Sequence, residues 1–408
     1  MDENRDLVAD AADTRLDARR LGVLFCCLWL SMIDGFNIQV IGFAAPAIVR
    51  AWHLAPSALG PIFGAGLFGS MVGAGLGILG DRLGLVRALI LFTLMFVVGT
   101  AATAWASDPA QLMALRFLTG IGLGGTLPNL MALTASQAPA RIRATLITIV
   151  ITGAPLGAGL GGFASGALIA TWGWQAVFAM GALVPLPGLL LLWMLRPRDA
   201  PPRTPLGAKG SFLAGFAILL SPRYRAGTLV LWVAVFFSVM LTYTLASWLP
   251  TLLTERGLGM RQAVLATVFL NLGVVVGGIG LGRLSDLWGP YKVLAAGYLL
   301  GAGPIALIGL ATGEAAIFVA IFTAAVLALG GQTGIGMVST LFYESSVRAT
   351  GVGVAILFGR LGAVVGPVLV GGLLAAGAGI PMLFLVGGVM ALLIAGLIGA
   401  MARVTLLR

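Results

Sequence analysis

Charged residues are scarce in this sequence. Asp, Glu, Lys and Arg together make up 9% of its 408 residues, whereas soluble proteins contain about 25%. Hydrophobic residues make up 59%, and the mean hydropathy is +1.06. A chain with so few charges does not cover a globular surface in water, so the composition excludes a soluble fold and predicts a membrane protein.

Cysteine and histidine are nearly absent, with two residues and one residue respectively. Cys26 and Cys27 are adjacent within an apolar run, where their spacing suits neither a structural disulfide nor a metal site. His53 stands alone. The apolar runs contain no pair of acids, no His or Cys cluster and no serine–histidine arrangement. We therefore expect no metal, no cofactor other than a proton as coupling ion, and no enzymatic activity.

Long apolar runs recur along the chain. Each has about 20 residues or more, the length at which a helix crosses a hydrocarbon core about 30 Å thick. Twelve transmembrane helices are predicted, and the sequence indicates an all-α membrane protein. The predicted spans are 21–49, 57–80, 88–106, 111–136, 145–170, 175–195, 226–253, 262–285, 291–312, 314–340, 347–375 and 380–402.

The basic residues are distributed unevenly between the two sides of these spans. Most Lys and Arg residues fall in segments on the side of the N-terminus, and only Arg50, Arg256 and Arg261 fall in the opposite loops. By the positive-inside rule this places both termini in the cytoplasm. The net charge of +10 therefore reports topology, and no basic cluster with aromatics indicates nucleic acid. We expect a monomer in the inner membrane of a bacterium.

The sequence contains an internal repeat. Residues 77–89, GILGDRLGLVRAL, correspond to 282–294, GRLSDLWGPYKVL, and the same offset relates Arg143 to Arg348. Two six-helix bundles with pseudo-symmetry are typical of transporters. The predicted segments are a cytoplasmic tail at 1–20, an N-terminal bundle at 21–195, a linker at 196–225 with a short helix at 210–220, a C-terminal bundle at 226–402 and a tail at 403–408.

Several stretches resemble a known family. They are DGFNIQVIGFAAPAI, RFLTGIGLGGTLPNLMALT, PARIRATLITIVITGAPLGAGLGG and YESSVRATGVGVAILFGRLGAVVGP. They are similar to the major facilitator superfamily and, within it, to the aromatic acid:proton symporters such as hydroxyphenylpropionate and hydroxybenzoate carriers. The resemblance implies the major facilitator fold and an aromatic acid substrate. The superfamily signature G-x-x-x-D-R-x-G is matched by Gly77, Asp81, Arg82 and Gly84.

An acidic residue lies near the centre of the first span. A charge there costs about 2.5 to 3.5 kcal/mol, so it persists with a partner or a water-filled cavity. Asp34 shares one helical face with Ser31 and Asn37. Either Asp34 bonds a neighbouring helix and fixes the packing, or it takes up and releases a proton as its surroundings change. We favour the proton site. Asn37 stands where the resembling family commonly has a second acid.

Two arginines are predicted within spans. Guanidinium groups bind carboxylates in two bonds, and an aromatic acid is an anion at neutral pH. We expect Arg360 to hold the substrate and Arg116 to pair with Asp34, because Arg116 and Asp34 lie in the same half. For either arginine, a fixed structural ion pair is the alternative.

The aromatic ring of a substrate needs an apolar wall. Trp232, Phe236 and Tyr243 fall on one face of the seventh span, with Phe36 and Trp248 as further candidates, although helix packing explains such a stripe equally well. Uncharged polar residues within spans suit a ring hydroxyl. They are Asn37, Asn129, Asn271 and Gln332, of which Asn37 and Gln332 are preferred.

Charged residues also mark the cytoplasmic ends of helices. We expect them to form the latch that closes this side of the protein rather than to bind substrate. These gating candidates are Asp81, Arg82, Arg141, Arg143, Asp286, Glu344 and Arg348.

The sequence therefore predicts a secondary active transporter that works by alternating access. Protonation of Asp34 would free Arg360 or Arg116 to bind the carboxylate, and proton and substrate would be released inside. One proton with one monoanion is electroneutral. The alternatives are proton-coupled efflux of hydrophobic compounds and, less favoured, a membrane sensor or enzyme.

Overall fold

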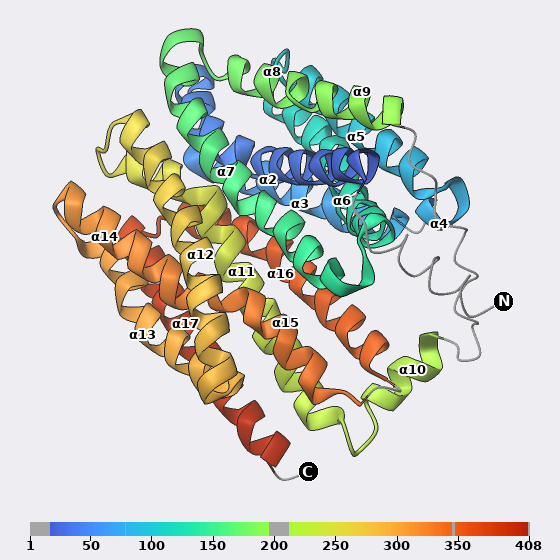
Figure 1. Ribbon diagram of the computed structural model, residues 1–408. Helices are drawn as coiled ribbons and strands as arrows, with labels where there is room; N and C mark the ends of the chain where they lie inside the picture. Colours follow the sequence, from blue (N-terminus) through green and yellow to red (C-terminus); the bar gives the residue numbers. More distant parts are fainter. Residues whose placement is uncertain (1–16, 78, 196–211, 345–346, 407–408) are drawn as a thin grey trace.

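The computed structural model describes residues 17–77, 79–195, 212–344 and 347–406. Over these residues it is built from helices, which Figure 1 shows as two groups, blue to green and yellow to red. Eleven helical stretches in the described part are long and apolar enough to cross a membrane. The predicted span at 111–136 is also a helix, but Arg116, Thr126 and Asn129 make it less apolar than the others, so twelve spans remain a prediction.

Among the described residues the first group contains eight α-helices, of which α4 is the shortest, with five residues. They are α2 (Ala18–Trp52), α3 (Leu59–Leu76), α4 (Leu79–Leu83), α5 (Leu85–Thr103), α6 (Pro109–Gln137), α7 (Arg143–Trp172), α8 (Gln175–Leu183) and α9 (Pro185–Leu195). Asp17 begins α2 and Asp108 begins α6, because each carboxylate accepts a backbone N–H of the first turn, at 2.7 and 2.9 Å.

The second group follows the linker. Its helices are α10 (Phe212–Leu219), α11 (Arg225–Glu255), α12 (Met260–Trp288), α13 (Pro290–Leu310), α14 (Glu314–Ala324), α15 (Gly331–Phe342), α16 (Arg348–Ala375) and α17 (Ile380–Leu406). The short helix expected at 210–220 is α10. A π-helical turn at Ala325–Leu329 separates α14 from α15; such turns occur often at functional sites.

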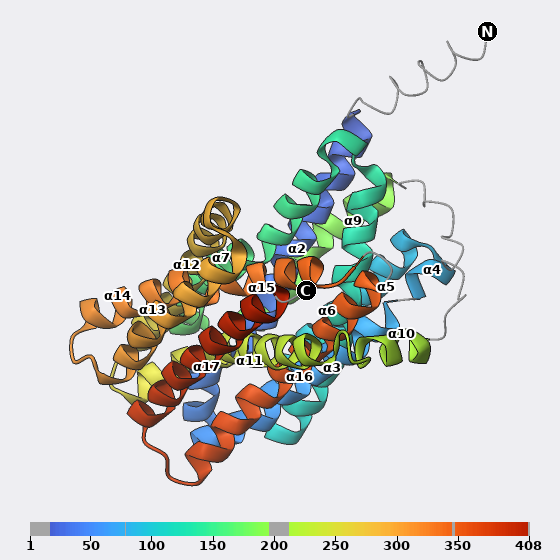
Figure 2. The same cartoon turned by 90° about the horizontal axis from the view of Figure 1, so that it is seen from below.

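The two groups meet along three helix pairs. α7 lies against α12, α3 against α16 and α2 against α11, and Figures 1 and 2 show the first two pairs side by side. The first two pairs are equivalents under the internal repeat, since α3 corresponds to α12 and α7 to α16. Leucine, isoleucine, valine and tryptophan side chains are exposed on the outer surface, among them Trp105 and Trp172, as expected for a surface that faces lipid.

The end of the interface away from the termini is tightly closed. The backbones of Gly60 on α3 and Gly371 on α16 nearly touch, and a Cβ on Gly371 would lie 2.9 Å from the Gly60 Cα. Beside this crossing Trp248 is completely buried, donates its indole N–H to the Pro367 carbonyl at 3.0 Å and packs edge-on against Phe63. The absence of Cβ atoms therefore allows the two bundles to seal this end.

Candidate functional site

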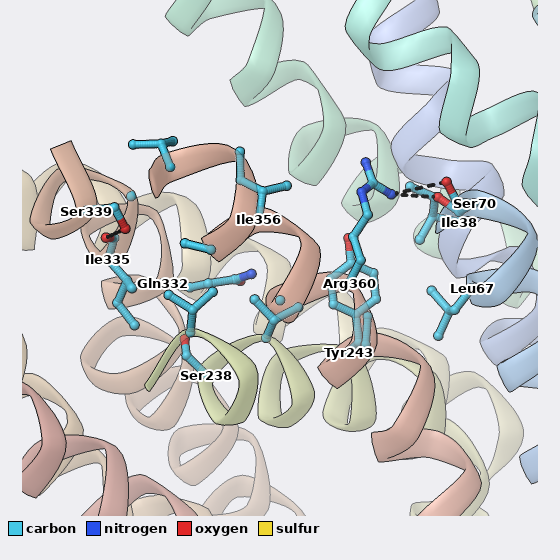
Figure 3. A pocket seen from close by; sticks show the side chains of 17 residues that line it. Ile38, Leu67, Ser70, Ser238, Tyr243, Gln332, Ile335, Ser339, Ile356 and Arg360 are labelled. Atoms are coloured by element: carbon cyan, nitrogen blue, oxygen red, sulfur yellow. Dashed lines mark hydrogen bonds between the residues drawn. The ribbon is translucent and has the colours of Figure 1, made fainter. Parts of the chain in front are cut away.

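A cavity of about 290 Å³ lies between the two bundles. Its walls come from α2 and α3 on one side and from α11, α15 and α16 on the other, so residues distant in sequence converge on it (Figure 3). Its volume is close to the lower end of the range of small-molecule sites, about 300 to 1,000 Å³. Apolar residues and glycines form most of the lining. The polar lining residues are Ser70, Ser238, Tyr243, Gln332, Ser339 and Arg360.

Arg360 is the cation of this cavity lining. One of its terminal nitrogens donates to the Ser70 hydroxyl at 3.0 Å and to the Ser70 carbonyl at 3.3 Å. Arg360 belongs to α16 and Ser70 to α3, so the contact joins the two bundles, and Figure 3 shows it at one end of the cavity. No ion pair of Arg360 with a described carboxylate occupies the guanidinium, which leaves it available to an anion.

Asp34 lies on α2 and is 2% exposed. Its Oδ1 atom makes no hydrogen bond with any described residue. Arg360 is close enough to Asp34 for the two charges to interact, and Tyr243 lies within the range of both. A buried carboxylate without hydrogen bonds is costly, and a proton or the nearby guanidinium reduces this cost. The arrangement suits a proton site.

Arg116 does not pair with Asp34, so this part of the prediction is wrong. Its guanidinium donates to the Thr103 and Thr119 hydroxyls at 2.7 and 3.1 Å and lies 5.0 Å from the centre of the Phe178 ring. Asp34 is eighteen residues from the end of α2 on the side away from the termini. Asn37, three residues nearer that side, is bonded by Thr100, and the Arg116 guanidinium is held farther on by Thr103 and Thr119. Hydroxyl groups of α5 and α6 therefore hold Arg116 away from Asp34.

The cation near Asp34 is therefore Arg360 from the opposite bundle. It is fifteen residues from the end of α16 on that same side, which places it within about 5 Å of the depth of Asp34. Arg116 instead lines a second, smaller space of about 30 Å³, together with Asn37 and with Ser247 of the second bundle; Ser70 lines both spaces.

Of the predicted substrate-binding residues, Arg360, Gln332 and Tyr243 line the main cavity. No described residue forms a hydrogen bond with the Gln332 side chain, whose amide is free to bind a ligand. Figure 3 shows Tyr243 beside Arg360, and Gln332 farther along the cavity.

The three predicted asparagines lie outside this cavity, and each is occupied by protein partners. Asn37 donates to the Ile33 and Gly181 carbonyls and accepts from Thr100.

Asn129 binds the Gly77 and Gly125 carbonyls at the turn before α4. Asn271 exchanges two amide hydrogen bonds with Gln39, at 3.0 and 2.9 Å, across the contact between α12 and α2. Their predicted role in substrate binding is not supported by these positions.

The aromatic candidates also differ from the prediction. Trp248 belongs to the seal described above. Phe36 is 6% exposed and packs against Phe43 and Gly161 within the first bundle. Trp232 stacks on Phe358, with ring centres 4.6 Å apart. Of these aromatic candidates Tyr243 alone reaches the cavity lining.

The predicted latch residues lie at the end that carries the termini. Glu344 forms an exposed ion pair with Arg223, and Arg348 donates to the Tyr343 carbonyl at 3.1 Å, so these contacts stay within the second bundle. Arg141, Arg143 and Asp286 are exposed; the side chains of Asp81 and Arg82 lie outside the described part. Among the described residues no ion pair joins the bundles at this end, and the latch remains a prediction.

The sequence reasoning missed Ser70 and Ser238. Neither carries a charge, and serine hydroxyls in membrane helices commonly bond the preceding turn of their own helix. A signal for Ser238 was present, since it precedes Tyr243 by five residues and is a buried polar residue of α11. Among the described residues no group of three His, Cys, Asp or Glu side chains is arranged for a metal.

Comparison with known proteins gives consistent results. The profile of the Major Facilitator Superfamily matches residues 24–367. A gallate transporter of Pseudomonas putida is 36% identical, over 92% of this chain and 91% of its own. A 3-(3-hydroxy-phenyl)propionate transporter of Escherichia coli is 37% identical, over 86% and 87%.

Among solved structures, a bacterial homologue of the human lysosomal transporter Spinster, in an inward-facing and unoccupied conformation, has a TM-score of 0.78. It is 19% identical and covers 96% of this chain and 98% of its own. This similarity concerns the fold alone.

Proposed function

Since the chain belongs to the Major Facilitator Superfamily, we propose that it is a proton-coupled symporter that takes up an aromatic carboxylic acid by alternating access. The family and the curated relatives are transporters and not enzymes. The observation that carries the proposal is Arg360, a guanidinium that faces the cavity between the bundles and lies close to the buried Asp34.

The substrate class is supported by the chemistry of the cavity and by the relatives. An aromatic carboxylate needs a charged donor for its anionic group and an apolar wall for its ring. Arg360 supplies the donor, while Val239, Ile335 and Ile356 supply apolar surface. The relatives named above transport gallate and 3-(3-hydroxyphenyl)propionate, which are aromatic acids of this kind.

The coupling step follows from the position of Arg360 between two partners. With Asp34 ionised, the carboxylate of Asp34 and the anionic substrate compete for the same guanidinium. A proton on Asp34 removes this competition, and the substrate carboxylate then replaces the Ser70 oxygens as the partner of Arg360. One proton and one monoanion leave the cavity without net charge, so the membrane potential contributes little to this cycle.

The conformational state of the transporter follows from which end of the interface between the bundles is closed. The cavity is lined by the halves of α11, α15 and α16 nearer the termini, and the other end is sealed at Gly60 and Gly371. With both termini in the cytoplasm, this is an inward-facing conformation. Rocking of the two bundles would open the sealed end and close the latch residues at the other.

Efflux of hydrophobic compounds is the weaker candidate. A fixed guanidinium within the cavity favours an anion over a neutral hydrophobic molecule. We expect the protein in the inner membrane of a bacterium, as a monomer with no resident cofactor.

The test is uptake of labelled benzoates into proteoliposomes under an imposed pH gradient, with valinomycin and potassium to clamp the potential. Accumulation that an uncoupler abolishes, without a substrate-evoked current, is the expected result. Accumulation of hydrophobic cations against the gradient, with no uptake of aromatic acids, would establish efflux instead.

A further inference from the structure

The cavity contains a second polar group at a distance from Arg360. Ser238 on α11 lines the cavity, and its hydroxyl oxygen lies 2.5 Å from the Tyr298 hydroxyl on α13. Tyr298 is completely buried and does not belong to the lining, so it contacts Ser238 from behind. Figure 3 shows Ser238 near Gln332 and away from Arg360. The cavity is therefore polar at Arg360 and again near Ser238 and Gln332, with Ser339 farther along.

The short contact determines which groups Ser238 offers to the cavity. A phenol is a stronger acid than an alkyl hydroxyl and is the better hydrogen-bond donor, so Tyr298 donates and Ser238 accepts. The Ser238 proton and its second lone pair then remain for a ligand. A hydroxyl held in this way is oriented before a ligand binds, which reduces the entropy lost on binding. The side-chain amide of Gln332 stands beside it, without a hydrogen-bond partner among the described residues.

The spacing between these two polar positions fits a benzene ring with substituents on opposite sides. Tyr243 lies beside Arg360, and Ser238 is five residues earlier on the same helix, an axial separation of about 7.5 Å. With the carboxylate on Arg360, a hydroxyl at the meta or para position points toward Ser238. A hydroxyl at the ortho position stays next to the carboxylate and does not reach it.

We infer that Ser238, held by Tyr298 and assisted by Gln332, is the residue that recognises a ring hydroxyl remote from the carboxylate. The preferred substrates are then aromatic acids hydroxylated at the meta or para position, rather than benzoate or its ortho-hydroxy derivative. Ser238 binds the substrate directly, and Tyr298 is a positioning residue. This inference rests on the proposed transport of aromatic acids.

Ser339 provides a matched control. It is also a serine in the cavity lining, but its hydroxyl donates to the Ile335 carbonyl of its own helix at 3.1 Å. Ser339→Ala therefore removes the same atom from the same cavity without removing the contact to Tyr298. Ser238→Ala removes the hydroxyl that binds the ring hydroxyl of the substrate. Tyr298→Phe removes only the phenol group that orients the Ser238 hydroxyl.

The experiment measures initial uptake rates of benzoate and of 2-, 3- and 4-hydroxybenzoate by each variant in proteoliposomes. The wild type should prefer the 3- or 4-hydroxy acid, in Vmax/KM, over both benzoate and the 2-hydroxy acid. Ser238→Ala and Tyr298→Phe should each reduce this preference roughly 3- to 10-fold, the effect of losing or misorienting one hydrogen bond. The change should be in KM for the hydroxy acid, with benzoate uptake and the Ser339→Ala variant unchanged.

Benzoate uptake reports whether a variant is folded. If Ser238→Ala does not reach the membrane, the Tyr298→Phe variant tests the inference by itself. Equal wild-type uptake of all four acids, or an undiminished preference in both variants, would overturn the inference but leave aromatic acid transport standing. An equal loss in Ser339→Ala would overturn it too. If the wild type takes up none of the acids, both the proposed function and this inference are wrong.

Discussion

Replacing Arg360 by alanine removes the cation from the main cavity, together with its contact to Ser70. An anionic substrate would then enter an apolar space with only neutral donors nearby. Removing one member of a buried charge pair costs about 2 to 5 kcal/mol. At about 1.4 kcal/mol per factor of ten, KM for an aromatic acid should rise by at least about 30-fold.

Arg360→Lys separates charge from geometry. Lysine keeps the positive charge but lacks the planar fork that binds a carboxylate in two parallel bonds. The loss of one charge-assisted hydrogen bond, about 1.5 kcal/mol or more, should raise KM roughly 10-fold. The order wild type, lysine, alanine is therefore the expected order of increasing KM, with the amount of protein in the membrane held equal by quantitative blotting.

The assay is uptake of labelled 4-hydroxybenzoate over a range of concentrations. Arg116→Lys is the control, since Arg116 is also a buried arginine but binds Thr103 and Thr119 away from this cavity. A KM within threefold of wild type for Arg360→Ala would refute the role of Arg360, and so would an equal effect of Arg116→Lys.

Three further predictions concern coupling and closure. Asp34→Asn should retain exchange of labelled for unlabelled substrate but lose accumulation driven by a pH gradient; accumulation with the native pH dependence would contradict this. Gly371→Leu should hold the sealed end open, because a Cβ there lies 2.9 Å from the backbone of α3, whereas one on the adjacent Gly372 meets nothing within 4 Å. With a cysteine introduced into the cavity lining, an impermeant thiol reagent added outside should label Gly371→Leu and not Gly372→Leu. Equal labelling of the two variants would show that the leucine side chain at 371 does not hold this end open. In the same assay Gln39→Ala and Asn271→Ala should increase labelling to a similar extent. The double variant should be labelled little more than either single variant, since each substitution removes the same contact. Additive effects would show that the two amides act separately.

The helical spans could be predicted because length and apolar composition determine them. The breaks within spans could not be predicted equally well. Pro185 divides the predicted span at 175–195 into α8 and α9, since proline favours the first turn of a helix over its interior. The π-helical turn at 325–329 consists of Ala, Val and Leu only, and one extra residue in a turn leaves the apolar pattern nearly unchanged.

Site residues could be predicted where the residue type has a high free-energy cost in a membrane. Asp34 and Arg360 stand out for this reason alone: Arg360 lines the cavity between the bundles, and Asp34 is buried within range of its charge. Which charged residues interact could not be predicted from whether they lie in the same half of the chain. Arg116 and Asp34 belong to helices of the same bundle, yet hydroxyl groups hold the Arg116 guanidinium, and the cation near Asp34 comes from the other bundle. The role of Asn37 could not be decided from sequence, because a buried amide serves packing and ligand binding with the same chemistry, and the structure shows it bonded to protein partners.

The separation of the two charges between bundles has a consequence for coupling. Asp34 belongs to the first bundle and Arg360 to the second, and Arg360 also holds Ser70 of the first. Any change in the charge of the cavity therefore changes the attraction between the bundles themselves. An ionised Asp34 with an empty cavity draws Arg360 toward α2, whereas a protonated Asp34 with a bound anion satisfies Arg360 through the substrate. An ion pair within one bundle, for example between Asp34 and Arg116, would give the same charge balance. Such a pair would exert no force across the interface between the two bundles. In the cycle that we propose, the cross-bundle position of Arg360 lets proton binding and substrate binding act on the same conformational equilibrium.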